Sequence, residues 1–188
     1  MSAVVVTIVL AFVGYLVTYL NSLRLSQRQE RLARVNRQLG DFYGPLYALT
    51  STNSRMFEEF LTHHARPNGK SAFRDETPPT EAELAEWRLW VTTVFLPNIR
   101  AMRDVVVEHA DLLDEPGMPP VLLELYAHVA GYDIIFARWE QGDYSEHLSV
   151  VTFPARDIHR YAEEGFTRLQ AEQRALIGRR RRRQPSRR

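Results

Sequence analysis

The chain begins with a run of 23 residues that contains no charged side chain, and most of this run is apolar. A helix needs about 20 apolar residues to cross the ~30 Å hydrocarbon core of a bilayer. Tyr15 and Tyr19 lie towards the end of the run, where an aromatic ring with a polar tip suits the headgroup layer. The pattern therefore predicts a transmembrane helix over residues 1–23.

Two other interpretations of this segment are less favoured. A secretory signal peptide would carry Lys or Arg before the apolar run and a small-x-small cleavage sequence after it. No basic residue precedes the run, and Asn21-Ser22-Leu23-Arg24 is a poor cleavage sequence. A helix buried in the core of a soluble protein is the second alternative.

Beyond residue 23, apolar side chains recur at helical spacing, and no segment shows the two-residue alternation of a half-buried strand. The first helix is expected to continue through Leu39 and to end at Gly40. Pro97 is expected to kink a later helix. Together the pattern predicts an all-α fold, in which a transmembrane helix continues into a four-helix-type bundle. The further helices are expected at about Tyr43–His64, Thr80–Asp114, Pro120–Trp139 and Pro154–Ile177.

Arginines follow the apolar run closely, and only Glu30 opposes them. The excess of positive charge places this side of the helix in the cytoplasm. We see no second segment that is long and apolar enough to span. The sequence thus predicts a single-pass inner-membrane protein, with its N-terminus outside and its C-terminal domain cytoplasmic. The arginines of this flank are Arg24, Arg28, Arg31, Arg34 and Arg37.

The net charge of +1 hides a strong partition along the chain. Residues 41–178 carry 12 basic against 22 acidic side chains, a net charge of −10, whereas the last ten residues include seven arginines. Nucleic-acid binding needs clustered cations, so the acidic body is a poor candidate for it. Charge and pattern divide the chain into an anchor (1–23), a basic juxtamembrane helix (24–40), a helical bundle (41–178) and a polybasic tail (179–188).

The polybasic tail is expected to be disordered, because its like charges repel one another. It would share the compartment of the anionic inner leaflet, where each arginine near the surface contributes about 1 kcal/mol of attraction. A solvated terminus without a role is the alternative. The arginines expected to contact lipid headgroups are Arg24, Arg28, Arg31, Arg179, Arg180 and Arg181.

The absence of cysteine excludes disulfides, thiolate nucleophiles and Cys-based zinc sites. Acid–histidine pairs occur four residues apart on three helices, whereas di-metal bundles use a Glu and a His three residues apart. We interpret these pairs as surface helix support and expect no catalytic residue, metal or cofactor. A metal-binding or enzymatic bundle that uses histidines and nearby carboxylates is the alternative function. Its histidines would be His63, His109, His128 or His159.

Five polar side chains lie on or beside the apolar stripes of the predicted helices: Asn53, Asn98, His109, His128 and Asp133. A buried polar group is costly unless it is hydrogen-bonded. One hypothesis is that these groups pair within the bundle and fix the register of its helices. The sharper hypothesis is that they line a small ligand pocket.

The anchor also presents a face of small side chains, the type that lets transmembrane backbones approach closely. Its central members are Ala11, Gly14, Thr18 and Asn21. The same three- and four-residue spacing continues as a heptad seam into the juxtamembrane helix. We expect either parallel self-association into a homodimer through this helix or packing of the later seam residues on the molecule's own bundle. The later seam residues are Leu25, Arg28, Leu32, Val35 and Leu39.

Several short strings carry a resemblance to small bacterial membrane-anchored helical proteins. The resemblance covers most of the body and implies no particular activity. It implies an anchored cytoplasmic helical domain in a bacterial plasma membrane, and it draws attention to Asn98 and His128. With the anchor, it favours an interaction or sensor module that binds a protein partner not yet identified. The strings are Gln38-Leu39, Phe42-Tyr43-Gly44-Pro45-Leu46-Tyr47, Trp90, Phe95-Leu96-Pro97-Asn98, Glu108-His109-Ala110-Asp111-Leu112, His128 and Tyr132.

Overall fold

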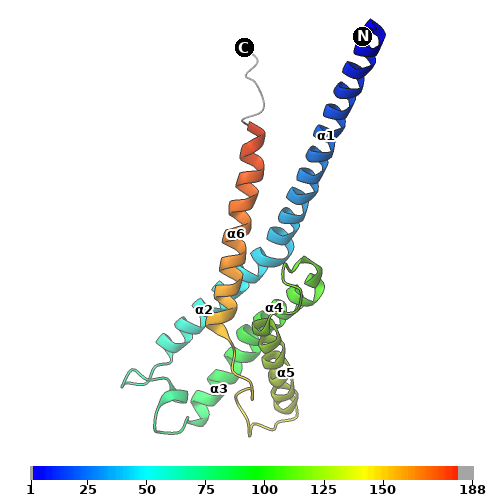
Figure 1. Ribbon diagram of the computed structural model, residues 1–188. Coiled ribbons are helices and arrows are strands. Elements are labelled where there is room, and N and C mark those ends of the chain that lie inside the picture. The colour runs from blue at the N-terminus through cyan, green and yellow to red at the C-terminus, as the bar shows by residue number, and fades with distance from the viewer. Residues whose placement is uncertain (1, 182–188) are drawn as a thin grey trace.

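The computed structural model describes residues 2–181, and every regular element within them is helical (Figure 1). Two π-helical turns, at Gln38–Tyr43 and Val91–Phe95, join α1 to α2 and α3 to α4, so residues 2–181 form four continuous helical rods. Short 3-10 turns lie at Ala72–Arg74 and Ala110–Leu112. The all-α prediction is confirmed. The α-helices are α1 (Ala3–Arg37), α2 (Gly44–His63), α3 (Glu81–Trp90), α4 (Leu96–Glu108), α5 (Pro120–Glu140) and α6 (Ala155–Arg181).

The helices α2 to α5 gather at one end of the molecule, and α1 and α6 extend from them in the same direction (Figure 1). α6 packs against both α1 and α2. Since α1 runs towards the gathered helices and α6 runs away from them, the start of α1 and the end of α6 lie at the same end of the molecule. The start of α1 lies beyond the reach of the rest of the fold.

The helix does not end at Gly40, and that expectation is wrong. Gly40 does not adopt the left-handed conformation that usually ends a helix; the chain passes through the π turn and continues as α2. The amide of Gly44 bonds to the carbonyl of Leu39, five residues back. The wider turn accommodates Pro45, which has no N–H and whose ring crowds the preceding turn.

The same arrangement recurs where a kink was expected at Pro97. The Leu96 amide bonds to the Val91 carbonyl, again five residues back, and Pro97 follows in the first turn of α4. Each of the two prolines thus follows a π turn, and the helix continues past it.

Upstream, Thr80 and Glu83 form the reciprocal side-chain-to-backbone bonds of a capping box at the start of α3.

The core lies between the helices and is continuous from the C-terminal part of α1, at Val35, to α6. Phe42, Tyr43 and Leu46 are almost fully buried, and Tyr43 lies against Gly165 of α6. A Cβ added at Gly165 would lie 2.2 Å from the Tyr43 ring, so this glycine permits the close approach of α6. Two of the later seam residues also belong to this core: Val35 is buried, and Leu39 packs on it, whereas Leu25 is exposed.

Two helical stretches of the described chain are long and apolar enough to cross a membrane. One begins at Ile8, and none of its most apolar window is buried. The other is α5, a third of whose window is buried, with side chains such as Leu122 and Leu125 in the core. The difference in burial between the two stretches indicates that α5 is a core helix, whereas the described residues leave the apolar surface of α1 uncovered.

The polybasic tail differs in part from its expected form. α6 continues to Arg181, so the backbone of the first three tail arginines is helical rather than disordered. The remaining tail, residues 182–188, lies outside the described residues.

Candidate functional site

A cavity of about 500 Å³ lies between α2, α5, the α3–α4 rod and the segment that leads into α6. Its walls are mainly apolar and aromatic, and a few polar groups interrupt them. Two of the polar side chains predicted from the apolar stripes, Asn53 and His128, line it. Both are more than nine-tenths buried, with 7% and 8% of their surface exposed. The aromatic members of the wall are Phe57, Trp87, Phe95, Tyr132 and Phe153.

Asn53 is held by Asn98. The Nδ2 of Asn98 donates to the Leu49 carbonyl at 3.1 Å and to the Oδ1 of Asn53 at 3.2 Å. Asn98 therefore joins α4 to α2 and fixes the orientation of the Asn53 amide. Within the described part of the chain, the Nδ2 of Asn53 has no hydrogen-bond partner. This leaves an unpaired donor on a residue that lines the cavity.

His128 is fixed by the backbone of the segment opposite. Its Nδ1 lies 2.6 Å from the Val151 carbonyl, which can only accept, so Nδ1 carries the proton. Burial lowers the pKa of His128, and the bond to Val151 opposes this effect only in part. The ring is thus neutral at pH 7, and its Nε2 is an acceptor without a partner among the described residues.

The segment 141–154 closes the cavity and is tied down by indole and hydroxyl donors. Trp87 Nε1 donates to the His147 carbonyl at 2.9 Å, and Ser149 Oγ donates to the His128 carbonyl at 3.3 Å. A Cβ at Gly131 would lie 2.2 Å from Ser149 Oγ, so the missing side chain lets the segment approach α5. These ties hold Val151 opposite the His128 ring.

Two other predicted site residues lie elsewhere. The Oδ1 of Asp133 lies 2.5 Å from Arg100, and its Oδ2 lies 3.6 Å from Arg103. His109 is the residue that follows α4, where its amide bonds to the Val105 carbonyl. Neither residue lines the cavity. The candidate site therefore comprises Asn53 and His128, with Asn98 as a positioning residue.

The acid–histidine pairs do not converge. His63 and Glu59 are 3.7 Å apart on the exposed side of α2, and His159 and Glu163 are 3.9 Å apart on α6. Among the residues that the structure describes, no group of three or more His, Asp or Glu side chains is arranged to hold a metal ion. The geometry offers nothing that supports the metal-binding alternative.

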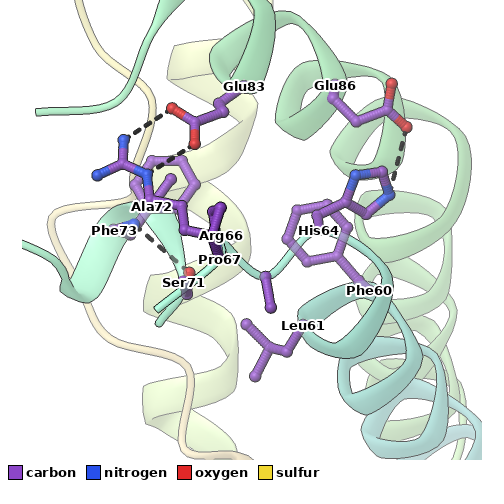
Figure 2. Close-up of a pocket in the computed structure, with 11 residues that line it drawn as sticks. Phe60, Leu61, His64, Arg66, Pro67, Ser71, Ala72, Phe73, Glu83 and Glu86 are labelled. Carbon is purple, nitrogen blue, oxygen red and sulfur yellow. Dashed lines mark hydrogen bonds and ion pairs between the residues drawn. The ribbon is translucent and has the colours of Figure 1, made fainter. Parts of the chain in front are cut away.

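A smaller pocket of about 310 Å³ lies at the end of α2, and Figure 2 shows that Arg66 dominates one side of it. Arg66 donates to both carboxylate oxygens of Glu83 at 2.8 Å and to Asp75 at 3.0 Å. The hydrogen bonds from Arg66 lower the pKa of Glu83 to about 2. Because Arg66 is already fully engaged with the loop and with α3, we interpret this pocket as structural.

The basic flank of the anchor contacts α6. Arg28 donates to the Leu176 carbonyl, and Arg31 pairs with Glu172 at 2.5 Å. Further along, Asn36 accepts a hydrogen bond from Gln173 at 2.8 Å. These contacts align the end of α6 with the juxtamembrane part of α1. They also show that the seam beyond Arg28 is covered by the molecule's own helices.

Sequence reasoning missed the segment that closes the cavity. Ser149, Val151 and Phe153 lie in a stretch expected only to be a loop, and their place depends on contacts far along the chain. The apolar residues Leu148, Val150, Val151 and Phe153 near the end of this loop were the available signal.

Comparison with known proteins adds no assignment. No protein-family model matches this chain, and no curated protein or solved structure matches it either.

Proposed function

We propose that the protein is a single-pass membrane protein whose cytoplasmic helical bundle serves as an interaction or sensor module. The observation that carries the proposal is the uncovered apolar surface of α1. Ile8, Leu10 and Phe12 are each more than 60% exposed, and α1 exposes a continuous run of large apolar side chains, whereas those that the bundle exposes are scattered singly. Apolar surface of this extent marks a membrane or partner interface. A bilayer covers all sides of such a helix at once.

Orientation rests on charge. The arginines that follow residue 23 favour the cytoplasm for the bundle. Arg24 and Arg37 lie on the exposed surface of α1, and Arg24 is free to reach headgroups at the membrane boundary. The proposed location is therefore a bacterial plasma membrane, with the start of the chain outside.

The geometry of α6 supports a contact between its end and anionic headgroups. Arg28 lies beside Leu176, and the two helices run in opposite directions. Four further residues along each helix, a rise of about 6 Å, bring Arg180 level with Arg24. The polybasic tail thus begins at the level where the proposed span ends, which is where cationic side chains gain most from an anionic leaflet.

Fractionation tests the proposal. The full chain should stay in the membrane pellet after extraction with alkaline carbonate, and a chain without residues 1–23 should not. Recovery of the full chain in the soluble fraction would contradict membrane anchoring.

Self-association is proposed for the small-residue face of the anchor. Ala11, Gly14, Thr18 and Asn21 are all exposed, and a Cβ added at Gly14 would meet nothing within 4 Å. Because α6 covers the seam beyond Arg28, the contact between two copies is confined to the anchor.

Single cysteines test this face directly, since the natural chain contains no cysteine. Gly14→Cys and Thr18→Cys should each form a crosslinked dimer in membranes. Leu16→Cys lies on the opposite face of the helix, at 100° per residue, and should not. Crosslinking at position 16 alone, or at none of the three, contradicts the proposed face.

A further inference from the structure

The cavity beside His128 is lined by an unusual combination of groups. Its wall is largely aromatic, yet it contains two buried polar side chains that each have one group without a partner in the described chain. Neither unpaired atom is among the fully buried ones of the described residues, so each can offer one hydrogen-bonding group to a molecule in the cavity that their residues line. We infer that this cavity binds a neutral, largely apolar small molecule that carries a hydroxyl group.

The hydroxyl follows from the two polar groups. The Nδ2 of Asn53 is a donor, because Asn98 occupies the carbonyl side of the amide. The Nε2 of His128 is an acceptor, because Nδ1 carries the proton towards Val151. A hydroxyl group can accept from an amide and donate to an imidazole. A molecule with only acceptors would leave Nε2 unpaired.

The residues that line the cavity indicate that the bound molecule is uncharged. Among the residues that the structure describes, no Lys or Arg side chain lines the cavity, and Glu58 is the one acidic residue that does so. Glu58 is exposed, so it lies at the mouth. An ion buried beyond it would have no countercharge, which is costly in an apolar environment. The aromatic and aliphatic walls instead suit a ring or a short hydrocarbon.

The size of the cavity fits this class. A volume of about 500 Å³ lies within the range of roughly 300–1,000 Å³ that small-molecule sites occupy. The segment 141–154 contributes Leu148, Val151 and Phe153 to the wall, and its hydrogen bonds hold it in place. The site is therefore formed before a ligand arrives. The inference goes beyond the proposed membrane role, and neither depends on the other.

A series of three fluorinated probes tests the inference by fluorine NMR. The full chain in lipid nanodiscs is titrated with 4-fluorobenzyl alcohol, 4-fluorotoluene and 4-fluorobenzoate, with empty nanodiscs as the background. The alcohol should bind saturably and more tightly than the toluene, and the benzoate should bind least. Absence of saturable binding of the alcohol, or tighter binding of the benzoate, overturns the inference.

Variants locate the binding. His128→Phe keeps an aromatic ring but removes the acceptor, and should weaken binding of the alcohol by about three- to tenfold, the worth of one hydrogen bond, with little change for the toluene. His63→Phe makes the same substitution on the exposed side of α2 and should bind like the natural chain. Equal binding of the alcohol by the His128 and His63 variants overturns the assignment.

A cavity-filling variant provides a second route in case the His128 variant fails to fold. Ser54 lines the cavity, is half-buried and makes no side-chain hydrogen bond within the described residues. Ser54→Phe should abolish binding of all three probes while the circular dichroism spectrum stays helical. Undiminished binding in a folded Ser54 variant shows that the probes bind elsewhere and overturns the inference.

Discussion

At the scale of single residues, His128 is the most informative side chain of the body. Its pKa is lowered because the ring is buried, although the bond to Val151 opposes this. An imidazole that must stay neutral in the folded state makes folding depend on pH. The cavity and the closing segment share this residue, so acid is expected to weaken both together.

The pH dependence has a definite sign. As the pH falls below about 6.5, the unfolded chain takes up a proton at position 128 before the folded chain does, so stability falls. His147, whose pKa is also lowered by burial and by Arg88, contributes in the same direction. Above about pH 7.5 both histidines are neutral in both states, and they cause no further change.

Chemical unfolding of the full chain in mild detergent at pH 7.5 and 5.5 measures this effect. The natural chain should lose stability on acidification, and His128→Phe should lose less. His63→Gln, on an exposed histidine, should behave like the natural chain. An equal loss in the His128 and His63 variants would show that His128 is not an acid-sensitive group.

The sequence revealed Asn53, Asn98 and His128 because a polar residue on an apolar stripe is conspicuous. It could not reveal that Asn53 and His128 face one cavity, since that depends on how α2 and α5 pack. Nor could it place Ser149 and Val151, whose positions follow from the missing side chain of Gly131. Helical periodicity says nothing about where a loop crosses a helix.

At the scale of elements, the two π turns explain why the helices continue past prolines. The sequence pattern predicted the helical segments well, because the spacing of apolar residues indicates which face of each helix is buried. It failed at Gly40, because a glycine there could equally end a helix or continue it. The choice depends on the Gly44–Leu39 bond, a backbone contact that side-chain spacing does not specify.

Two glycines in this region make a matched pair. A Cβ at Gly44 would lie 2.3 Å from the Leu39 carbonyl oxygen, whereas a Cβ at Gly40 would meet nothing within 4 Å. Gly44→Ala should therefore cost about 1–3 kcal/mol of stability, typical of forced overpacking. Gly40→Ala should stabilise the chain by roughly 0.5–1 kcal/mol, because it replaces glycine inside a continuous helix.

Urea unfolding of the two variants beside the natural chain provides the measurement. Destabilisation by Gly40→Ala would indicate that the chain does not pass through position 40 as a helix. A neutral Gly44→Ala would contradict the close approach of residues 44 and 39.

At the scale of the whole molecule, α1 and α6 form the link between the bundle and the proposed membrane. Arg28 and Arg31 contact α6, so the position of α6 is tied to the direction of α1. In the proposed module, these contacts would couple a change in the bundle to α1. This arrangement suits a module that reports on a bound ligand or partner.

The most direct test of the central claim is the accessibility of single cysteines in intact cells. Ser2→Cys lies at the outer end of the proposed span, and Gln141→Cys lies on the exposed surface of the body. A membrane-impermeant maleimide should label position 2 in intact cells and position 141 only after the inner membrane is permeabilised. Labelling of position 141 in intact cells, or protection of position 2, would contradict a single-pass anchor with a cytoplasmic bundle.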